Sequence, residues 1–389
     1  MRTSERTAPE VTGNPAGTGD QKEIFSSNGV RLSGVHWAIT AALVLVVCLG
    51  LPALWPRVET FAPGPDYRIP YALSNDYWHY ARYCRESAGD DQVLVLGDSV
   101  VWGEYVAPQD TLVHHLNAQA GRARFVNLGV NGIHPVAMAG LIEYYGRAVS
   151  GQDVLLHYNP LWMSSKRHDL QSEKESRFNH PKLVPQFWPR IPCYKESGAK
   201  RVGIVTEHYL PFRAWSNHLA VAYFGEMSLT AWAFEHPYRN PLGKVTLALP
   251  TPDTALRHEP VPWTEKGIPQ ANFVWVLPAD SFQWYFFQRA VRTLQARGNR
   301  LFVLVGPFNE PMLEAESLAV YRGIKEVIEA WLEAQQIPHW VAPPLPSERY
   351  ADASHPLGEG YAQLARQLLE QEAFAPFARV GEATQLAAR

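Results

Sequence analysis

The chain of 389 residues is poor in cysteine and carries little net charge. Its three cysteines, Cys48, Cys84 and Cys193, form no C-x-x-C pair, which excludes zinc-ribbon and thioredoxin-type sites. The formal net charge is −3 and no cluster of five or more Lys and Arg residues occurs, so the sequence lacks the basic footprint of nucleic-acid binding. Whether Cys84 and Cys193 pair stays open, because pairing depends on a distance that the sequence does not give.

Charged residues are also missing from residues 32–56, with Arg31 and Arg57 at the two ends. About 20 consecutive apolar residues span a bilayer as a helix, and Trp37 and Trp55 suit the two interfaces. No polar face appears at helical spacing and no A-x-A cleavage site follows, which disfavours a core helix and a cleaved signal peptide. We therefore expect a single transmembrane anchor. Lys and Arg flank it evenly, and we expect the large following domain to lie outside the cytoplasm.

The rest of the chain divides by composition. Residues 1–31 are rich in Thr, Gly, Ser, Glu and Pro, which predicts a flexible tail. Residues 57–91 form an aromatic connector with a short helix over 77–83. Residues 92–378 are the expected folded domain, and 379–389 a second tail.

Within the domain, apolar strand-length runs alternate with helical segments. Strands are predicted over 92–96, 124–128, 153–158, 300–305 and 339–341, and helices over 111–120, 136–149, 282–297 and 311–336 with a last one ending near 372. Asp110 is the expected N-cap of the first of these helices. Such alternation predicts an α/β fold with a parallel sheet. It breaks over 161–280, an expected insertion with one helix near 212–234.

Three polar side chains follow elements of this sheet in a pattern that nucleophilic catalysis needs. The run ending at Gly97 leads into Asp98 and Ser99, which places a serine at the carboxyl end of a buried strand. Asp352 and His355 share one loop before the last helix. A serine nucleophile requires an adjacent base, and the base requires a carboxylate that orients it. These residue types predict acyl chemistry at the sheet edge.

These motifs resemble those of the SGNH (GDSL) hydrolase superfamily. The matching blocks are Gly97-Asp98-Ser99 with Gly103, Asn127-Leu-Gly-Val-Asn-Gly132, and Asp352-Ala-Ser-His355, and the resemblance covers roughly 92–160 and 281–372. It implies a flavodoxin-like three-layer α/β/α fold around a central parallel sheet. The insertion falls outside the resemblance.

The resemblance also implies roles for individual residues. Ser99 takes the position of the nucleophile, His355 that of the general base, and Asp352 that of the carboxylate that orients it. The backbone N–H groups of Ser99 and Gly132, with the side-chain amide of Asn159, take the positions of the oxyanion hole. The family's chemistry requires no cofactor and no metal, and none is expected here.

One block departs from the family pattern. The family usually shows G-x-N-D after the third strand, whereas this chain has His157-Tyr-Asn159-Pro160. Asn159 still follows the third strand, as the oxyanion asparagine should. Asn309, after the next strand, is a rival for that role. The sequence favours Asn159, because it follows the third strand, where the family has its oxyanion asparagine, whereas Asn309 follows the fourth.

Three functions fit these features. The first is a membrane-anchored serine esterase acting on acyl, foremost acetyl, esters. The second is an extracytoplasmic acyltransferase that modifies a cell-envelope polysaccharide, and the third is an inactive binding module, since fold alone does not fix function. The expected partners are an acyl-ester or glycan substrate and the membrane, while protein partners stay unknown. The insertion holds six tryptophans suited to sugars or lipid, although each is more readily explained by core packing: Trp162, Trp188, Trp215, Trp232, Trp263 and Trp275.

Overall fold

A computed structural model describes residues 32–89, 91–251 and 256–379. The chain divides into two units, Met1–Val47 and Cys48–Arg389. Helix α1 (Gly34–Leu54) crosses this boundary and, with the turn Trp55–Arg57, is long and apolar enough to span a membrane, a property that signal sequences share. The tail expected over 1–31 lies outside the described residues, as does 380–389.

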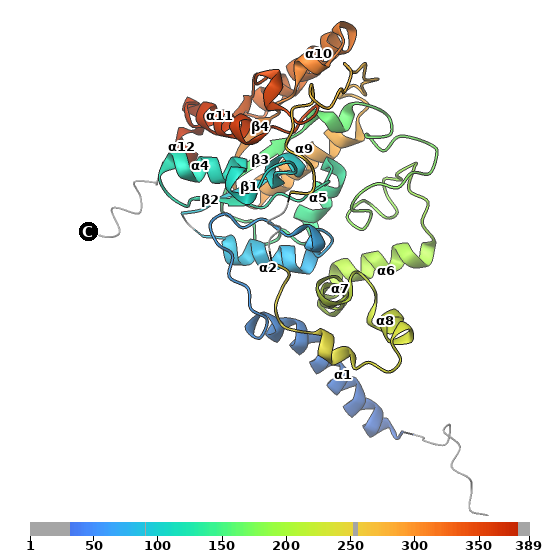
Figure 1. Cartoon of the computed structure of the whole chain (residues 1–389). Helices are drawn as coiled ribbons and strands as arrows, with labels where there is room; N and C mark the ends of the chain where they lie inside the picture. Colours follow the sequence, from blue (N-terminus) through green and yellow to red (C-terminus); the bar gives the residue numbers. More distant parts are fainter. Residues whose placement is uncertain (1–31, 90, 252–255, 380–389) are drawn as a thin grey trace, which may run out of the picture. The chain divides into compact units, whose positions relative to one another are not determined.

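Five parallel strands form the sheet of the second unit, in the order β2-β1-β3-β4-β5 (Figure 1). The strands are β1 (Val93–Leu96), β2 (Phe125–Asn127), β3 (Asp153–Tyr158), β4 (Arg300–Val305) and β5 (His339–Val341). All four residues of β1 are buried, as expected for a central parallel strand. The predicted α/β class with an all-parallel sheet is confirmed.

Helices contact the sheet through two apolar clusters. Val93 and Val95 of β1 belong to one cluster, whereas Leu94 and Leu96 belong to the other, because successive strand side chains point to opposite faces. The first cluster contains side chains of α4 (Leu112–Ala120), α11 (Gly358–Leu369) and α12 (Ala375–Ala378). The second contains side chains of α2 (Tyr77–Ser87), α5 (Pro135–Tyr144), α9 (Phe282–Ala296) and α10 (Ala315–Ala334).

Several helix ends differ from the sequence prediction. The N-cap of α4 is Thr111, whose Oγ1 accepts a hydrogen bond from the His114 N–H at 3.3 Å, so the expectation of Asp110 was wrong. Helix α5 ends at Tyr144 rather than 149. Helix α10 begins at Ala315, after a turn that holds Pro311. Local caps and turns, rather than apolar periodicity, set these boundaries.

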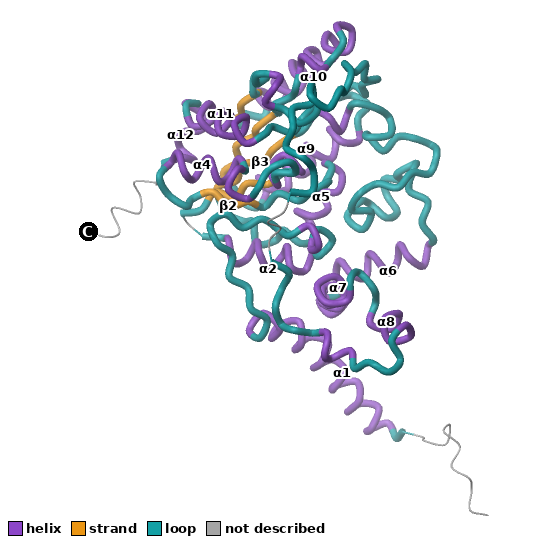
Figure 2. Tube along the Cα trace, in the orientation of Figure 1, coloured by secondary structure: helices purple, strands orange, loops and turns teal. Residues whose placement is uncertain are grey.

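The insertion between β3 and α9 is built from helices and long loops (Figure 2). It contains α6 (Gly198–Tyr209), α7 (Pro211–Phe224) and α8 (Leu229–Glu235), so the expected single helix over 212–234 was wrong. Gly225 adopts φ of +60° and ends α7, a conformation that glycine takes at little cost.

The segment expected as a connector contributes to the core. Tyr80, Tyr83 and Cys84 of α2 are buried there, and α2 runs to Ser87 rather than stopping at 83. Cys84 is a free thiol, as is the buried Cys193, so the pairing that the sequence left open is absent between these two described residues. Most of the insertion's tryptophans pack as expected: Trp215, Trp232, Trp263 and Trp275 are buried, whereas Trp188 is 87% exposed.

A buried ionic network joins this segment to the insertion. His218 of α7 is fully buried between two carboxylates, with Nδ1 2.6 Å from Asp76 and Nε2 2.9 Å from Glu59. Arg82 of α2 pairs with the same Glu59 at 2.8 Å. Burial alone would lower the pKa of His218, but the Asp76 and Glu59 carboxylates raise it to about 9. Burial likewise opposes the Glu59 charge, but His218 and other donors lower its pKa to about 2.

Replacing His218 with leucine is expected to lower the free energy of unfolding by about 3 kcal/mol, because it leaves two buried carboxylates short of a cation. The wild-type contribution of His218 should be fully present below pH 6.5 and lost as the pH rises through about 9. The contribution of Glu59 to the free energy of unfolding should be present above pH 4.5 and lost as the pH falls through about 2. Urea unfolding of the full chain at several pH values measures both. Ser216→Ala, an exposed change on the same helix, is the control, and equal stability of the two variants would refute the prediction.

Candidate active site

The serine stands on a sharp turn that only glycine permits. Strand β1 ends at Leu96, Gly97 and Asp98 follow, and Ser99 opens the short helix α3 (Ser99–Trp102). A Cβ on Gly97 would lie 2.3 Å from the Val101 side chain and 2.9 Å from that of His157. Helix α3 therefore packs directly against the strand ends, and Ser99 is held at the carboxyl edge of the sheet.

Arg68 fixes the far end of this turn. Its guanidinium donates to the carbonyl oxygens of Gly103 at 2.6 Å and Val106 at 2.8 Å, and it lies 4.1 Å from the ring centroid of Trp102. The carbonyl groups at a helix C-terminus carry partial negative charge, so a buried cation there is favourable. The segment before the sheet thus braces the serine turn, a role that no motif in the sequence indicated.

The three residues predicted to form a triad lie in one hydrogen-bonded chain. His355 Nε2 is 2.8 Å from Ser99 Oγ, although the two residues are 256 positions apart. On the other side of the ring, Nδ1 is 2.8 Å from both carboxylate oxygens of Asp352. The backbone N–H groups of Ser354 and His355 donate to Asp352 at 2.9 and 3.0 Å, which fixes the carboxylate.

The hydrogen bonds between Asp352 and His355 shift the pKa values of both side chains. Burial alone would lower the pKa of His355, but the Asp352 carboxylate raises it above its ordinary value of 6.5. Burial alone would raise the pKa of Asp352, yet His355 and the two backbone donors hold it well below its usual range. Asp352 is therefore ionised at neutral pH and can stabilise an imidazolium.

A second buried carboxylate, that of Asp98, forms hydrogen bonds with the residues around the turn at Ser99. It accepts hydrogen bonds from the Val100 N–H at 3.0 Å, the Trp162 indole at 2.8 Å and the Asn159 amide at 2.9 Å. His157 Nδ1 lies 3.3 Å from it. Burial would raise the pKa of Asp98, but His157 lowers it. No motif in the sequence indicated this contact between His157 and Asp98.

The two candidate asparagines hold different parts of the site. The Asn159 amide nitrogen donates both to Asp98 and, at 3.2 Å, to the hydroxyl of Ser354, so it links the serine turn to the Asp-His loop. Asn309 donates to the carbonyl of Asp352 at 3.2 Å and supports that loop from the neighbouring strand. Donation by Asn159 to an oxyanion stays a prediction.

Gly132 lies where a donor to an oxyanion is expected, in the turn after β2. It adopts φ of +71°, and a Cβ there would lie 2.3 Å from the amide nitrogen of Asn179, which donates to the Gly132 carbonyl at 3.3 Å. Within the described ranges, the backbone N–H groups of Ser99 and Gly132 donate to no protein acceptor. Both are therefore available to a ligand.

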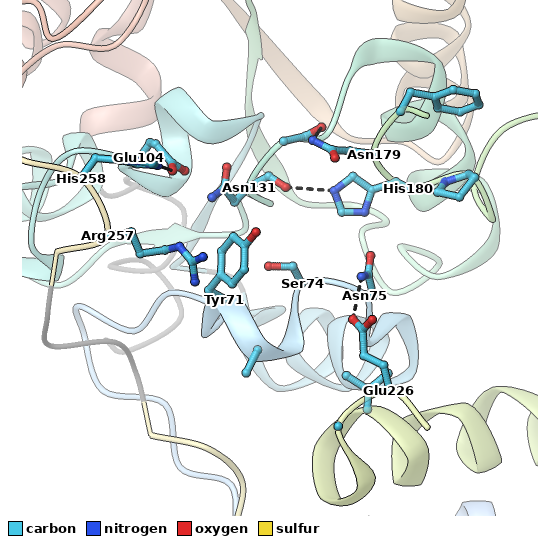
Figure 3. A pocket seen from close by; sticks show the side chains of 16 residues that line it. Tyr71, Ser74, Asn75, Glu104, Asn131, Asn179, His180, Glu226, Arg257 and His258 are labelled. Carbon is cyan, nitrogen blue, oxygen red and sulfur yellow. Dashed lines mark hydrogen bonds and ion pairs between the residues drawn. The ribbon is translucent and has the colours of Figure 1, made fainter. Parts of the chain in front are cut away.

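A cavity of about 850 Å³ with both polar and apolar lining opens beside Gly132 (Figure 3). Its polar lining comes from three parts of the chain: Tyr71, Ser74 and Asn75 before the sheet, Glu104 and Asn131 after β1 and β2, and Asn179, His180, Glu226, Arg257 and His258 of the insertion. Apart from Asn131 and Gly132, which belong to one sequence block, no lining residue was singled out from the sequence, because the others share no motif and meet only in the folded chain.

Comparison with models of known protein families found no match, and comparison with curated proteins found none either.

Proposed function

We propose that the protein is a serine ester hydrolase of the SGNH type that acts on acyl, foremost acetyl, esters. The hydrogen-bonded chain Ser99–His355–Asp352 supports this proposal most strongly. Ser99 lies 256 positions from the loop that holds His355 and Asp352, and the distances suit proton transfer from a serine to an imidazole oriented by a carboxylate. The buried, glycine-bounded turn that presents Ser99 suits a nucleophile rather than an ordinary surface serine.

The proposed reaction has two steps. Ser99 Oγ attacks the ester carbonyl carbon while His355 Nε2 accepts the hydroxyl proton, and Asp352 stabilises the imidazolium. The tetrahedral intermediate collapses, the alcohol leaves with the proton from His355, and the acyl group stays on Ser99. Water, deprotonated by His355, then attacks the acyl-enzyme; the bond to Ser99 Oγ breaks as His355 returns the proton to that oxygen, and the acid is released.

The oxyanion of each intermediate requires preorganised donors. We assign this role to the backbone N–H groups of Ser99 and Gly132, which have no protein acceptor within the described ranges. The Asn159 amide donates hydrogen bonds to Asp98 and Ser354. It therefore holds the turn at Ser99 in a fixed position relative to the loop of Asp352 and His355. Losing one oxyanion donor typically costs about 100- to 1,000-fold in kcat.

The proposal includes a finer description of the fold and its location. The strand order 2-1-3-4-5 is that of flavodoxin-like folds and supports a three-layer α/β/α arrangement. The apolar helix α1 supports a single-pass membrane anchor with the domain outside the cytoplasm. A reporter fused after residue 389 should then be active only outside the cytoplasm, and activity inside would refute this orientation.

The runner-up function differs only in what accepts the acyl group. An acyltransferase would pass it from Ser99 to a sugar hydroxyl of an envelope polysaccharide, and the polar side chains in the lining of the cavity beside Gly132 would suit such an acceptor. Turnover of p-nitrophenyl acetate by the full chain, and its loss in Ser99→Ala, tests the serine chemistry. Measuring acetylated product with and without added polysaccharide separates transfer from hydrolysis.

A further inference from the structure

Part of the insertion carries highly exposed apolar side chains. Tyr238 is 100% exposed, Phe234 83% and Leu242 76%. They lie close together in the sequence, from α8 to the turn Pro241–Lys244, and we call these three side chains the α8 patch. Single exposed apolar residues are ordinary on a soluble protein, whereas a group of them in one short segment marks a contact with another protein or with a membrane.

The backbone beneath the α8 patch is held by specific contacts. Trp232 of α8 is buried, with its ring centroid 5.4 Å from that of Phe224, and it stacks on His236 at 4.6 Å. The side chain of Asn240 accepts a hydrogen bond from the backbone N–H of Leu242 at 3.0 Å, which caps the turn. One side of this segment therefore packs on the protein, while its other side presents aromatic and aliphatic groups to the surroundings.

The same segment is attached to the residues that directly follow α1. Trp55, the first residue after that helix, packs against the apolar cluster that contains Trp232. Val245, which follows the turn, packs against this cluster as well. Two residues further on, the carbonyl of Leu247 accepts a hydrogen bond from the backbone N–H of Thr60 at 3.2 Å. The α8 patch is therefore carried by a segment that is fixed to the end of the apolar helix.

The position of Trp55 indicates what the α8 patch meets. Trp and Tyr side chains gather where a membrane meets water, and Trp55 ends the apolar run of the proposed anchor. A segment that packs on Trp55 therefore lies within reach of the lipid headgroups. Its exposed charged side chains are the cations Arg239 and Lys244 and the single carboxylate of Glu235, a balance that suits headgroup phosphates.

We propose that the α8 patch inserts into the headgroup layer of the membrane that α1 spans, so that the second unit contacts the bilayer at two places. The inference rests on the proposed membrane anchor and adds a second lipid contact to it. Insertion removes the rings of Phe234 and Tyr238 and the side chain of Leu242 from water, which is favourable for apolar surface. This part of the insertion then limits how far the second unit tilts on its anchor.

The test places a fluorescent nitrobenzoxadiazole label on one cysteine of the full chain. The two labelled variants are Tyr238→Cys and Val327→Cys, each combined with Cys48→Ser, and the thiols of Cys84 and Cys193 are buried and stay unlabelled. Val327 is the matched control, because it is half exposed on α10, at the opposite end of the second unit from α8 (Figure 1). Each chain is reconstituted into phosphatidylcholine vesicles, with and without phosphatidylcholine that carries a nitroxide quencher near the top of its acyl chain.

The nitroxide should quench the label at position 238 several-fold more than the label at 327, because interfacial side chains lie roughly 5–10 Å into the boundary of headgroups and acyl chains. Leu242→Cys, also combined with Cys48→Ser, should behave like Tyr238→Cys, so the result does not depend on one variant. Equal quenching at 238 and 327 would overturn the lipid contact. A label at 238 that is shielded from water but not quenched would also overturn it, and would indicate a protein partner or a second copy of the chain.

The native Cys48 separates this inference from the proposed anchor. It lies in α1 and is partly exposed, so the same label on the otherwise unchanged chain reports whether α1 enters the bilayer. Quenching at Cys48 without quenching at position 238 would overturn the contact of the α8 patch and leave the anchor in place. Quenching at neither position would overturn both proposals, and quenching at both supports the two contacts.

Discussion

Replacing Ser99 with alanine is expected to lower kcat for p-nitrophenyl acetate by about 10⁴- to 10⁶-fold, the range found when a triad nucleophile is deleted. The chain should still fold, because among the described residues the Ser99 side chain bonds only His355, while Asp98 caps the following helix. Initial rates and circular dichroism of the full chain in detergent measure both.

The matched control is Ser150→Ala, which deletes one hydroxyl that bonds the Arg297 carbonyl at an exposed turn. We expect its rate to equal that of the wild type. Residual turnover in a folded Ser99→Ala chain above one tenth of the wild-type rate would mean that another residue carries the reaction.

Replacing Asp352 with asparagine is expected to lower kcat by about 10⁴-fold with little change in fold. The asparagine amide would donate where the carboxylate now accepts from His355 Nδ1, so the ring would take the wrong tautomer for proton transfer. The measurement is the rate of p-nitrophenyl acetate hydrolysis, and Asp280→Asn, an exposed change, serves as the control. A loss below tenfold would show that Asp352 does not orient the base.

The contact between Asp352 and His355 also predicts how the activity of the wild type depends on pH. His355 must be neutral to accept the proton, and Asp352 raises its pKa above 6.5. Activity should therefore fall as the pH drops through a midpoint above 6.5. In Asp352→Asn the midpoint should move to lower pH, because burial disfavours the imidazolium and only the weaker effects of Asp98 and Glu104 on the pKa of His355 then oppose it. An unchanged midpoint would assign the titration to another group.

The strand positions, and the sheet edge at which Ser99, His355 and Asp352 meet, were predictable from sequence because each depends on a strong local signal. Buried strands such as 153–158 and 300–305 are continuous apolar runs, and their observed bounds agree with the prediction. Ser99 and the Asp-His loop each follow such an element, and parallel topology alone brings them to one sheet edge. Helix ends depended on weaker signals, such as the choice between Thr111 and Asp110 as a cap.

The groups around the triad were not predictable, because each depends on contacts between distant segments. Arg68 carries no motif, yet it braces the turn through carbonyl groups more than 30 residues away. Glu104 and His258 meet only because the insertion folds back over the loop after α3. The buried His218 lies on an apolar helix face, and its partners Asp76 and Glu59 precede the sheet. Periodicity reports which face is buried but not which polar groups meet there.

The most direct test of the central claim is covalent trapping of the nucleophile. A fluorophosphonate probe incubated with the full chain should form one phosphonyl adduct, and peptide mass spectrometry should place it on Ser99. Labelling should weaken as the pH falls, because His355 must accept the Ser99 proton. An adduct on another residue, or equal labelling of the Ser99→Ala chain, would contradict the assignment of Ser99 as the nucleophile.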